Sequence, residues 1–505
     1  MDVDDKKPDL RSEKIIRLVR NGSEKFWHGV ARKRMIEVFQ KTARTVPAYK
    51  DFLRKNKINP VKIKSFEDFK IVPPVSKKNY LLQYPFKDLA WGGKLNKPSI
   101  FTSTSSSTGE PFYFLRSHQL EWESSIAHEL FMRLRPVSSE KPILIVVGFG
   151  MGVWIGGLIT YRAFEIAAER GGHSVSIITP GINKIEILKS LKNLAPHYSQ
   201  IILAGYPPFI KDVIDEAQAE KVNIKKLNLR LLFAAETFTE NFRDYVAKKA
   251  GIKNIYLDTF NIYGSADIGT MAYETPISIL VRRLAIKNHP LFNKIFPEVN
   301  KTPTFAQYNP LFINFESTNG ELLLTGDNVI PLVRYDMGDH GGVMEYGDVL
   351  KKINNEGFSL AEETRRAGIE NHIYKLPFVY VYERKDLSTT LYGLQIYPEM
   401  VRETLIINPL NRFLTGKASM ITRFDKNHNQ YLEINLELRK NQKPIPKLKA
   451  VVSSKIFKNL RLKNSEFREL HNYLGDKVIP RLVFWQYEHP LHFKPGIKQK
   501  WIKKA

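Results

Sequence analysis

The chain has 505 residues, of which 43% are hydrophobic and 11% aromatic, so it can form a large packed core and is not disordered over most of its length. It contains no cysteine, which excludes disulfides, cysteine nucleophiles, thiolate zinc sites and iron–sulfur clusters. The formal net charge is +25, but the basic residues are scattered along the chain, so no specific nucleic-acid partner is expected.

The N-terminal residues and the apolar runs favour a cytoplasmic protein without a membrane span. The first residues are charged and lack the apolar core of a signal peptide. The longest apolar run, residues 143–159, holds five glycines, which favours a buried strand, a tight loop and a helix start. The oligomeric state is open, with a homodimer as one option.

Apolar spacing predicts helices within residues 1–60, followed by loops at paired prolines. From about residue 100 to 265, apolar strands then alternate with amphipathic helices. This alternation predicts an α/β domain with a largely parallel sheet. The expected strands are 142–149, 173–180, 200–205, 229–236 and 254–264. The expected helices are 158–172, 184–195, 207–221 and 239–251, the last with Thr239 as its N-cap.

The sequence pattern changes twice in the second half of the chain. Residues 311–317, 320–326 and 329–339 are strand-like with short turns, which indicates an antiparallel or barrel-like piece. After about residue 386, helical patterns at 397–406 and 446–462 mix with strands at 431–440 and 478–487. We therefore expect an α/β fold with two domains. Residues 1–385 would form a large multi-layer domain with mostly parallel sheets and a small barrel-like part, and 386–505 a small mobile α+β domain.

Two glycine-containing segments are candidate ligand loops. Seven hydroxyl residues fill positions 102–108, directly before Gly109. Small side chains allow backbone N–H groups to approach a phosphate, and hydroxyls add donors; a flexible linker is the alternative. The second segment, 148–152, reads Gly-Phe-Gly-Met-Gly and lacks the third glycine of the dinucleotide pattern, so NAD binding is not expected.

Four further residues are candidates for chemistry, each with an ordinary structural alternative. Asp267 follows a strand and could hold a hard cation such as Mg²⁺, or cap a turn. Asp339 follows another strand and could accept hydrogen bonds from both ribose hydroxyls, or belong to a hairpin turn. Asp386 lies where the composition changes, as a hinge residue would. Lys498 could neutralise charge during group transfer, or lie on a solvated tail.

The order of these motifs resembles the adenylate-forming superfamily of acyl-CoA synthetases and luciferase-like ligases. Within it, the chain is most similar to the phenylacetate–CoA ligase branch, including its capsule-biosynthesis-associated relatives. The features of that branch are Pro47-Ala48-Tyr49, the segments 73–77 and 148–157, and Arg334-Tyr335. The resemblance spans roughly residues 30–500.

The resemblance implies a role for each motif. The phosphate-binding loop would consist of Thr104, Ser105, Ser106, Ser107, Thr108 and Gly109. Residues that border adenine would be Ala235, Glu236, Thr237, Tyr263 and Gly264. The remaining roles are Asp267 for magnesium and catalysis, Asp339 for ribose, Arg384 as a second nucleotide contact, Asp386 as the hinge and Lys498 as the catalytic lysine. Ser106 replaces the usual Gly and Asp267 the usual Glu, and Lys500 competes with Lys498 for its role.

The implied function is activation of a carboxylic acid with ATP and Mg²⁺ to an acyl-AMP, followed by transfer to coenzyme A. Two alternatives stay open: a related ligase whose acceptor is an amine, a hydroxyl or a protein thiol, and a basic surface- or nucleic-acid-binding pseudoenzyme. The acid itself cannot be read from the sequence. Residues 149–154 and Tyr206 would suit the wall of an aryl- or fatty-acid pocket, and would equally suit ordinary core packing.

Overall fold

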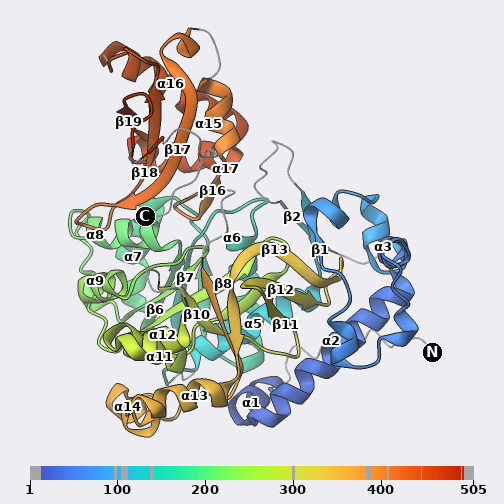
Figure 1. Cartoon of the computed structure of the whole chain (residues 1–505). Helices are drawn as coiled ribbons and strands as arrows, with labels where there is room; N and C mark the ends of the chain where they lie inside the picture. Colours follow the sequence, from blue (N-terminus) through green and yellow to red (C-terminus); the bar gives the residue numbers. More distant parts are fainter. Residues whose placement is uncertain are drawn as a thin grey trace.

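The computed structural model describes residues 13–95, 99–103, 112–136, 142–297, 302–382, 389–405, 409–444, 446–490 and 492–493. Figure 1 shows a large body with a smaller C-terminal unit, drawn in orange and red, at one end of it. The expected α/β fold with a small separate α+β unit is confirmed. Among the described residues, no helix has both the length and the apolar character needed to span a bilayer.

One large sheet organises the body. Its strands lie in the order β11-β12-β13-β14-β10-β9-β8-β7-β6-β4-β5, and β1 also pairs with β13. From β5 to β8 neighbouring strands are parallel, and from β8 to β11 they are antiparallel. The parallel strands are β4 (Ile143–Gly148), β5 (Val175–Ile178), β6 (Gln200–Gly205), β7 (Leu229–Ala234) and β8 (Thr259–Ser265). The remaining strands are β1 (Val75–Ser76), β9 (Gly269–Tyr273), β10 (Thr304–Gln307), β11 (Ile313–Thr318), β12 (Glu321–Gly326), β13 (Leu332–Met344) and β14 (Phe378–Tyr382).

The parallel strands are buried on both faces because helices cover each side. In β4, Leu144 and Val146 belong to one core cluster, whereas Ile145 and Val147 belong to another. Strands buried on both faces read as continuous apolar runs, which is why the sequence pattern predicts them. The first face carries α7 (Lys184–Asn193), α8 (Pro207–Glu216) and α9 (Glu240–Ala250). The second carries α5 (His118–Met132), α6 (Ile155–Gly171), α11 (Pro276–Lys287), α12 (His289–Ile295) and α13 (Tyr346–Asn355).

Local capping fixes several helix ends. The Thr239 hydroxyl accepts a hydrogen bond from the Phe242 N–H at 3.2 Å, which confirms it as the N-cap of α9. The strand expected over 254–264 is instead a short helix, α10 (Ile255–Asp258), followed by β8. The Asn254 side chain accepts hydrogen bonds from Tyr256 and Leu257 N–H groups, and this cap starts the helical turn.

A third cluster packs the N-terminal helices against the antiparallel half of the sheet. It includes Phe39 and Tyr49 from the helices and Tyr335 from β13. Further short elements are β2 (Ile100–Ser103), β3 (Tyr113–Arg116), α4 (Phe66–Phe69) and α14 (Leu360–Ala367). The N-terminal helices are α1 (Lys14–Asn21), α2 (Glu24–Thr45) and α3 (Pro47–Lys55).

The C-terminal unit is a three-stranded sheet with helices packed on it. β17 (Leu414–Phe424) and β18 (Gln430–Leu438) are antiparallel, and β19 (Arg481–Trp485) runs parallel to β18. A hairpin, β15 (Thr389–Leu391) and β16 (Leu394–Ile396), precedes this sheet. The helices are α15 (Pro398–Leu405), α16 (Pro446–Lys463) and α17 (Ser465–Leu474). The boundary expected at residue 386 falls outside the described residues.

Candidate functional site

A cavity of about 400 Å³ lies at the carboxyl ends of the parallel strands, and residues of the C-terminal unit also line it. Open α/β sheets bind ligands at this edge. Every predicted site residue that the structure describes lines this cavity: Ala235, Glu236, Tyr263, Gly264, Asp267 and Asp339. The predicted residues Thr104 to Gly109, Arg384, Asp386 and Lys498, as well as Lys500, lie outside the described residues.

Tyr263 and Asp339 meet although they are far apart in sequence. The Tyr263 hydroxyl, at the end of β8, donates a hydrogen bond to Asp339 Oδ2 on β13. Asp339 is only 7% exposed, and the Tyr263 ring stacks on Phe315 with centroids 6.2 Å apart. A fixed aromatic ring beside an oriented carboxylate can contact the base and the sugar of a nucleotide.

The backbone beside Tyr263 requires glycine. The pairing of β8 with β9 shifts register between Tyr263 and Gly264. A side chain on Gly264 would put its Cβ 2.7 Å from the Gly269 carbonyl oxygen, closer than van der Waals contact allows. Gly264 therefore brings the two backbones together, and the irregular register sets the direction of the Tyr263 side chain.

Asp267 is held by two partners and is 2% exposed. The Tyr335 hydroxyl donates to Asp267 Oδ2 at 2.5 Å, and Lys77 Nζ lies 3.5 Å from Oδ1. No sequence motif indicates a role for Lys77, although this residue ends the segment 73–77 that is similar to the phenylacetate–CoA ligase branch. Of the described residues lining the cavity, Lys77 is the one with a permanent positive charge.

Arg334 explains why the segments 73–77 and 334–335 come together. Its guanidinium donates to the Lys70 carbonyl oxygen at 2.6 Å and lies 3.2 Å from Glu316. β1 pairs with β13 immediately beyond, with Val75 opposite Tyr335. Arg334 thus ties the segment leading to Lys77 onto β13, which brings Lys77, a lining residue, and the buried Tyr335 to the same carboxylate.

The loop after β7 lines the cavity with Ala235, Glu236 and Thr237. Ala235 has φ +74°, a left-handed conformation that costs a residue with a side chain roughly 1–2 kcal/mol. The Thr237 hydroxyl pairs with that of Thr304 at 2.9 Å. Strained backbone of this kind persists only where the surroundings fix it.

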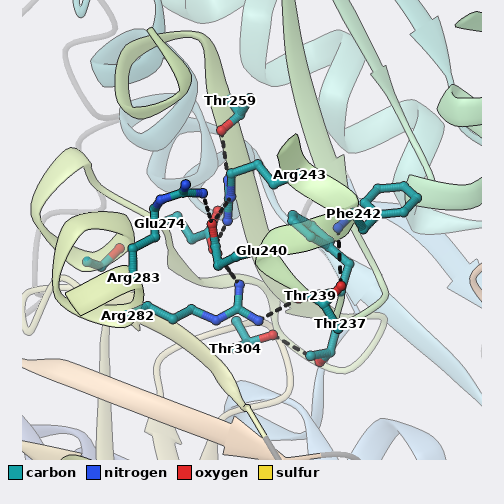
Figure 2. Close-up of polar contacts among 12 residues, drawn as sticks. Thr237, Thr239, Glu240, Phe242, Arg243, Thr259, Glu274, Arg282, Arg283 and Thr304 are labelled. Atoms are coloured by element: carbon teal, nitrogen blue, oxygen red, sulfur yellow. Dashed lines mark hydrogen bonds and ion pairs between the residues drawn. The ribbon is translucent and has the colours of Figure 1, made fainter. Parts of the chain in front are cut away.

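A buried ion-pair network fixes this loop, as Figure 2 shows. Arg243 pairs with Glu274 at 2.7 Å and with Glu240 at 3.0 Å, and Arg282 pairs with Glu240 at 2.7 Å. Arg282 also donates to the carbonyl oxygen of Phe238, next to Thr237. Burial opposes ionisation of Glu240, but the neighbouring guanidinium groups outweigh it and lower its pKa to about 2. Glu240 is therefore charged, and the network anchors one wall of the cavity.

Asn261, on β8, is a site residue that the sequence analysis missed. Its side chain lines the cavity and is 3% exposed, and its Oδ1 has no hydrogen-bond partner among the described residues. A buried acceptor left unpaired costs about 1–3 kcal/mol, so a ligand N–H would bind favourably here. The signal in the sequence is an asparagine between two apolar residues, Phe260 and Ile262, in the middle of the strand.

The glycine-rich segment after β4 forms another wall. Of the segment 149–154 and Tyr206, the residues that line the cavity are Phe149, Gly150, Trp154 and Tyr206, whereas residues 151–153 do not line it. Phe149 and Tyr206 pack edge to face with centroids 5.1 Å apart. Aromatic rings at this wall provide an apolar surface next to the polar residues at the strand ends.

Glu236 links the body to the C-terminal unit. Its carboxylate accepts hydrogen bonds from the Gly393 N–H and from Gln430 Nε2, the latter at 2.9 Å. Nearby, the Tyr392 hydroxyl donates to Asp212 at 3.2 Å. Gly393 and Glu466 also line the cavity, so the C-terminal unit completes its wall.

Replacing Glu236 with alanine is expected to speed hydrogen–deuterium exchange of the Gly393 amide by about ten- to a hundredfold. The physical reason is the loss of a charge-assisted hydrogen bond, which contributes about 1.5–3 kcal/mol. Exchange measured by mass spectrometry on peptides covering β15 and β16 checks this. Glu216→Gln is the control, because Glu216 is a partly exposed ion-pair partner of Lys184 and Lys477, and its loss should change exchange little. Equal exchange in the two variants would show that Glu236 does not hold the hairpin.

The described part of the cavity lining offers carboxylates but not a complete metal site. Among the described residues, no group of three or more His, Cys, Asp or Glu side chains could hold a metal ion. Mg²⁺ in nucleotide enzymes commonly takes one or two carboxylates and completes its shell with phosphate oxygens and water. The single carboxylate of Asp267 fits such a shared ion.

No protein-family model matches the sequence, and no curated protein does either. Among solved structures, 2-hydroxyisobutyryl-CoA ligase in complex with 2-HIB-AMP and CoA in the thioesterification state aligns over 97% of this chain and 92% of that chain, with TM-score 0.61 and 14% identity. The same ligase in the postadenylation state with 2-HIB-AMP gives TM-score 0.51 at 15% identity, with the same coverage. Its open conformation gives 0.50 at 15% identity over 95% of this chain and 91% of that chain. At these identities the likeness shows that the chain has the fold of an adenylate-forming ligase.

Proposed function

We propose that this protein is an adenylate-forming ligase that activates a carboxylic acid with ATP and transfers the acyl group to coenzyme A. One observation carries the proposal. Residues 235, 263, 267 and 339 belong to separate sequence motifs, and all of them line one cavity. A fold shared along nearly the whole chain with an acyl-CoA ligase supports it. The segments 73–77 and 148–157 and the Arg334-Tyr335 pair favour the phenylacetate–CoA ligase branch.

The nucleotide would lie between the β7 loop and the end of β8. The unpaired Asn261 Oδ1 suits the exocyclic amine of adenine, and the Tyr263 ring offers a stacking surface. Asp339 would accept hydrogen bonds from the ribose hydroxyls. Thr104 to Gly109 would surround the phosphates with backbone N–H groups and hydroxyls.

In the first half-reaction, an oxygen of the acid attacks the α-phosphorus of ATP, and pyrophosphate leaves. Lys77 beside Asp267 would orient the phosphate and the carboxylate of the acid, and Lys498 would neutralise the charge that develops. Mg²⁺, held by Asp267 and phosphate oxygens, supplies further charge neutralisation when bound.

In the second half-reaction, the thiolate of coenzyme A attacks the acyl carbonyl, and AMP leaves. Lys498 and the attacking thiol would approach the same small cavity, so one domain arrangement would not serve both steps. The chain superposes better on the thioesterification state of the ligase than on its postadenylation or open states. We infer that the Glu236 contacts to Gly393 and Gln430 belong to the thioester-forming arrangement, and that rotation about Asp386 brings in Lys498.

The proposal is tested by measuring pyrophosphate release from ATP with short, fatty and aromatic acids, with and without coenzyme A. Release that depends on one class of acid, with a thioester product detected by mass spectrometry, is the expected result. Release without any thioester would point to an amine, hydroxyl or protein-thiol acceptor. No release with any acid would reject the ligase and favour a pseudoenzyme.

Asp339→Ala is expected to raise the KM for ATP by about ten- to a hundredfold, with a smaller effect on the KM for the acid. The reason is the loss of charge-assisted hydrogen bonds to the ribose, about 1.5–3 kcal/mol. Steady-state kinetics with each substrate varied in turn checks this. Asp336→Ala is the control: it lies on the same strand, accepts a hydrogen bond from the Gly338 N–H, and does not line the cavity. Equal rises in both variants would contradict the ribose assignment.

A further inference from the structure

One end of the cavity is enclosed by α5, α6, β8 and β9. Apolar or small residues there are Gly156, Ile159, Ile262 and Gly269, and the hydroxyl residues Thr160 and Thr270 also line the cavity from α6 and β9. Gly269 packs against the side chains of Leu120 and Ile159. If position 269 carried a Cβ, this atom would lie 3.1 Å from Leu120 and 3.3 Å from Ile159. Ile262 belongs to the core cluster that contains α5, whereas its neighbour Tyr263 packs against the cluster of the N-terminal helices, so the two side chains lie on opposite faces of β8. The α5 side is therefore the part of the lining that is available to the tail of the acid.

His128, on α5, also lines the cavity and is 0% exposed. Its Nδ1 lies 2.8 Å from the Ser124 carbonyl oxygen. A carbonyl oxygen only accepts hydrogen bonds, so Nδ1 carries the hydrogen and Nε2 has a free lone pair. Nε2 has no hydrogen-bond partner among the described residues.

The imidazole is neutral at physiological pH. Burial lowers the pKa of His128 to about 4, although the hydrogen bond to Ser124 acts in the opposite direction. The ring is also fixed, because it packs edge to face on Phe164 with centroids 4.7 Å apart. The site therefore presents one oriented, neutral hydrogen-bond acceptor in apolar surroundings.

We propose that His128 Nε2 accepts a hydrogen bond from the tail of the substrate, so that the preferred acid carries a hydroxyl or N–H group at the end remote from its carboxylate. This inference rests on the proposed function and narrows its substrate class. A plain fatty or aryl acid would leave Nε2 unpaired, and sites built to bond a polar group discriminate strongly against analogues that lack it.

The test uses acids in matched pairs that differ only in a terminal hydroxyl: butanoic and 4-hydroxybutanoic, hexanoic and 6-hydroxyhexanoic, phenylacetic and 4-hydroxyphenylacetic acid. The measured quantity is the ratio of kcat/KM within each pair in ATP–pyrophosphate exchange. At least one pair should favour the hydroxylated acid by about tenfold or more, which corresponds to about 1.4 kcal/mol. In His128→Leu this ratio should fall close to one.

Two further variants separate specificity from folding. His128→Gln keeps an acceptor near the position of Nε2 and should retain part of the preference. His173→Leu is the matched control, because His173 Nε2 is also buried without a partner among the described residues but does not line the cavity. It should leave the ratio unchanged.

The inference is overturned if the unsubstituted acid is equal or better in every pair, or if His128→Leu keeps the preference of the wild type. A wild type that uses none of these acids also overturns it. In that case the broader acid screen decides separately whether the ligase proposal stands.

Discussion

Replacing Lys498 with alanine is expected to lower the rate of acyl-AMP formation by about 10²–10³-fold, the usual effect of removing one charge-stabilising group from a transition state. Among the described residues that line the cavity, the one permanent cation is Lys77, and Asp267 lies 3.5 Å from it. The charge that spreads over phosphate and carboxylate oxygens therefore needs a second cation. ATP–pyrophosphate exchange measures this step alone.

The same variant should largely retain thioester formation from synthetic acyl-AMP and coenzyme A, because the proposed rotation would remove the lysine from the cavity for that step. Lys500→Ala is the matched control, because Lys500 is two residues from Lys498 in the sequence. If Lys500→Ala loses exchange and Lys498→Ala keeps it, the roles of the two lysines are reversed. If both half-reactions fall equally in Lys498→Ala, the two-arrangement scheme is wrong.

The second large effect is expected from Glu274→Ala, which should lower the free energy of unfolding of the large domain by about 3–5 kcal/mol. Glu274 is 0% exposed and pairs with Arg243, which is equally buried, so the substitution leaves a buried guanidinium short of its partner. Domains are typically stable by only about 5–15 kcal/mol. Urea denaturation followed by tryptophan fluorescence checks the loss.

Asp244→Ala provides the comparison for the same network. Asp244 pairs with Arg283 at 2.9 Å, but its side chain is 51% exposed, so removing it should cost about 0–1 kcal/mol. If the two variants lowered the free energy of unfolding by similar amounts, burial would not determine how much each ion pair of this network contributes to stability. Glu274→Gln keeps the shape of the side chain and shows whether loss of the charge alone disturbs ATP binding through Phe238 and Thr237.

The sequence predicted the parallel half of the sheet well, because β4, β6 and β7 are buried on both faces and read as apolar runs. It missed α5, where Glu121 and Glu129 are fully buried. Each is paired with an arginine, Arg116 and Arg170 respectively. Charged residues inside a core hide the apolar period of a helix, and the compensating partners cannot be identified without the fold.

In the candidate site too, residues in local motifs were predicted and residues that depend on contacts between distant segments were missed. Tyr263, Asp267 and Asp339 were predicted from local motifs, and all three line the cavity. Lys77 and His128 were missed as site residues because nothing near them in sequence indicates a ligand. Lys77 reaches Asp267 through the pairing of β1 with β13, and His128 reaches the cavity through the packing of α5 on the sheet. Contacts between distant segments depend on topology, which local patterns do not encode.

The central claim is that the cavity forms an acyl-adenylate. The most direct measurement is incorporation of labelled pyrophosphate into ATP, since this exchange requires reversible acyl-AMP formation and needs no acceptor. We predict that exchange depends on an added carboxylic acid. At low ATP concentration, Asp339→Ala should reduce the exchange rate, whereas Asp336→Ala should not. Absence of exchange with every acid tested, from a folded protein, would contradict the account.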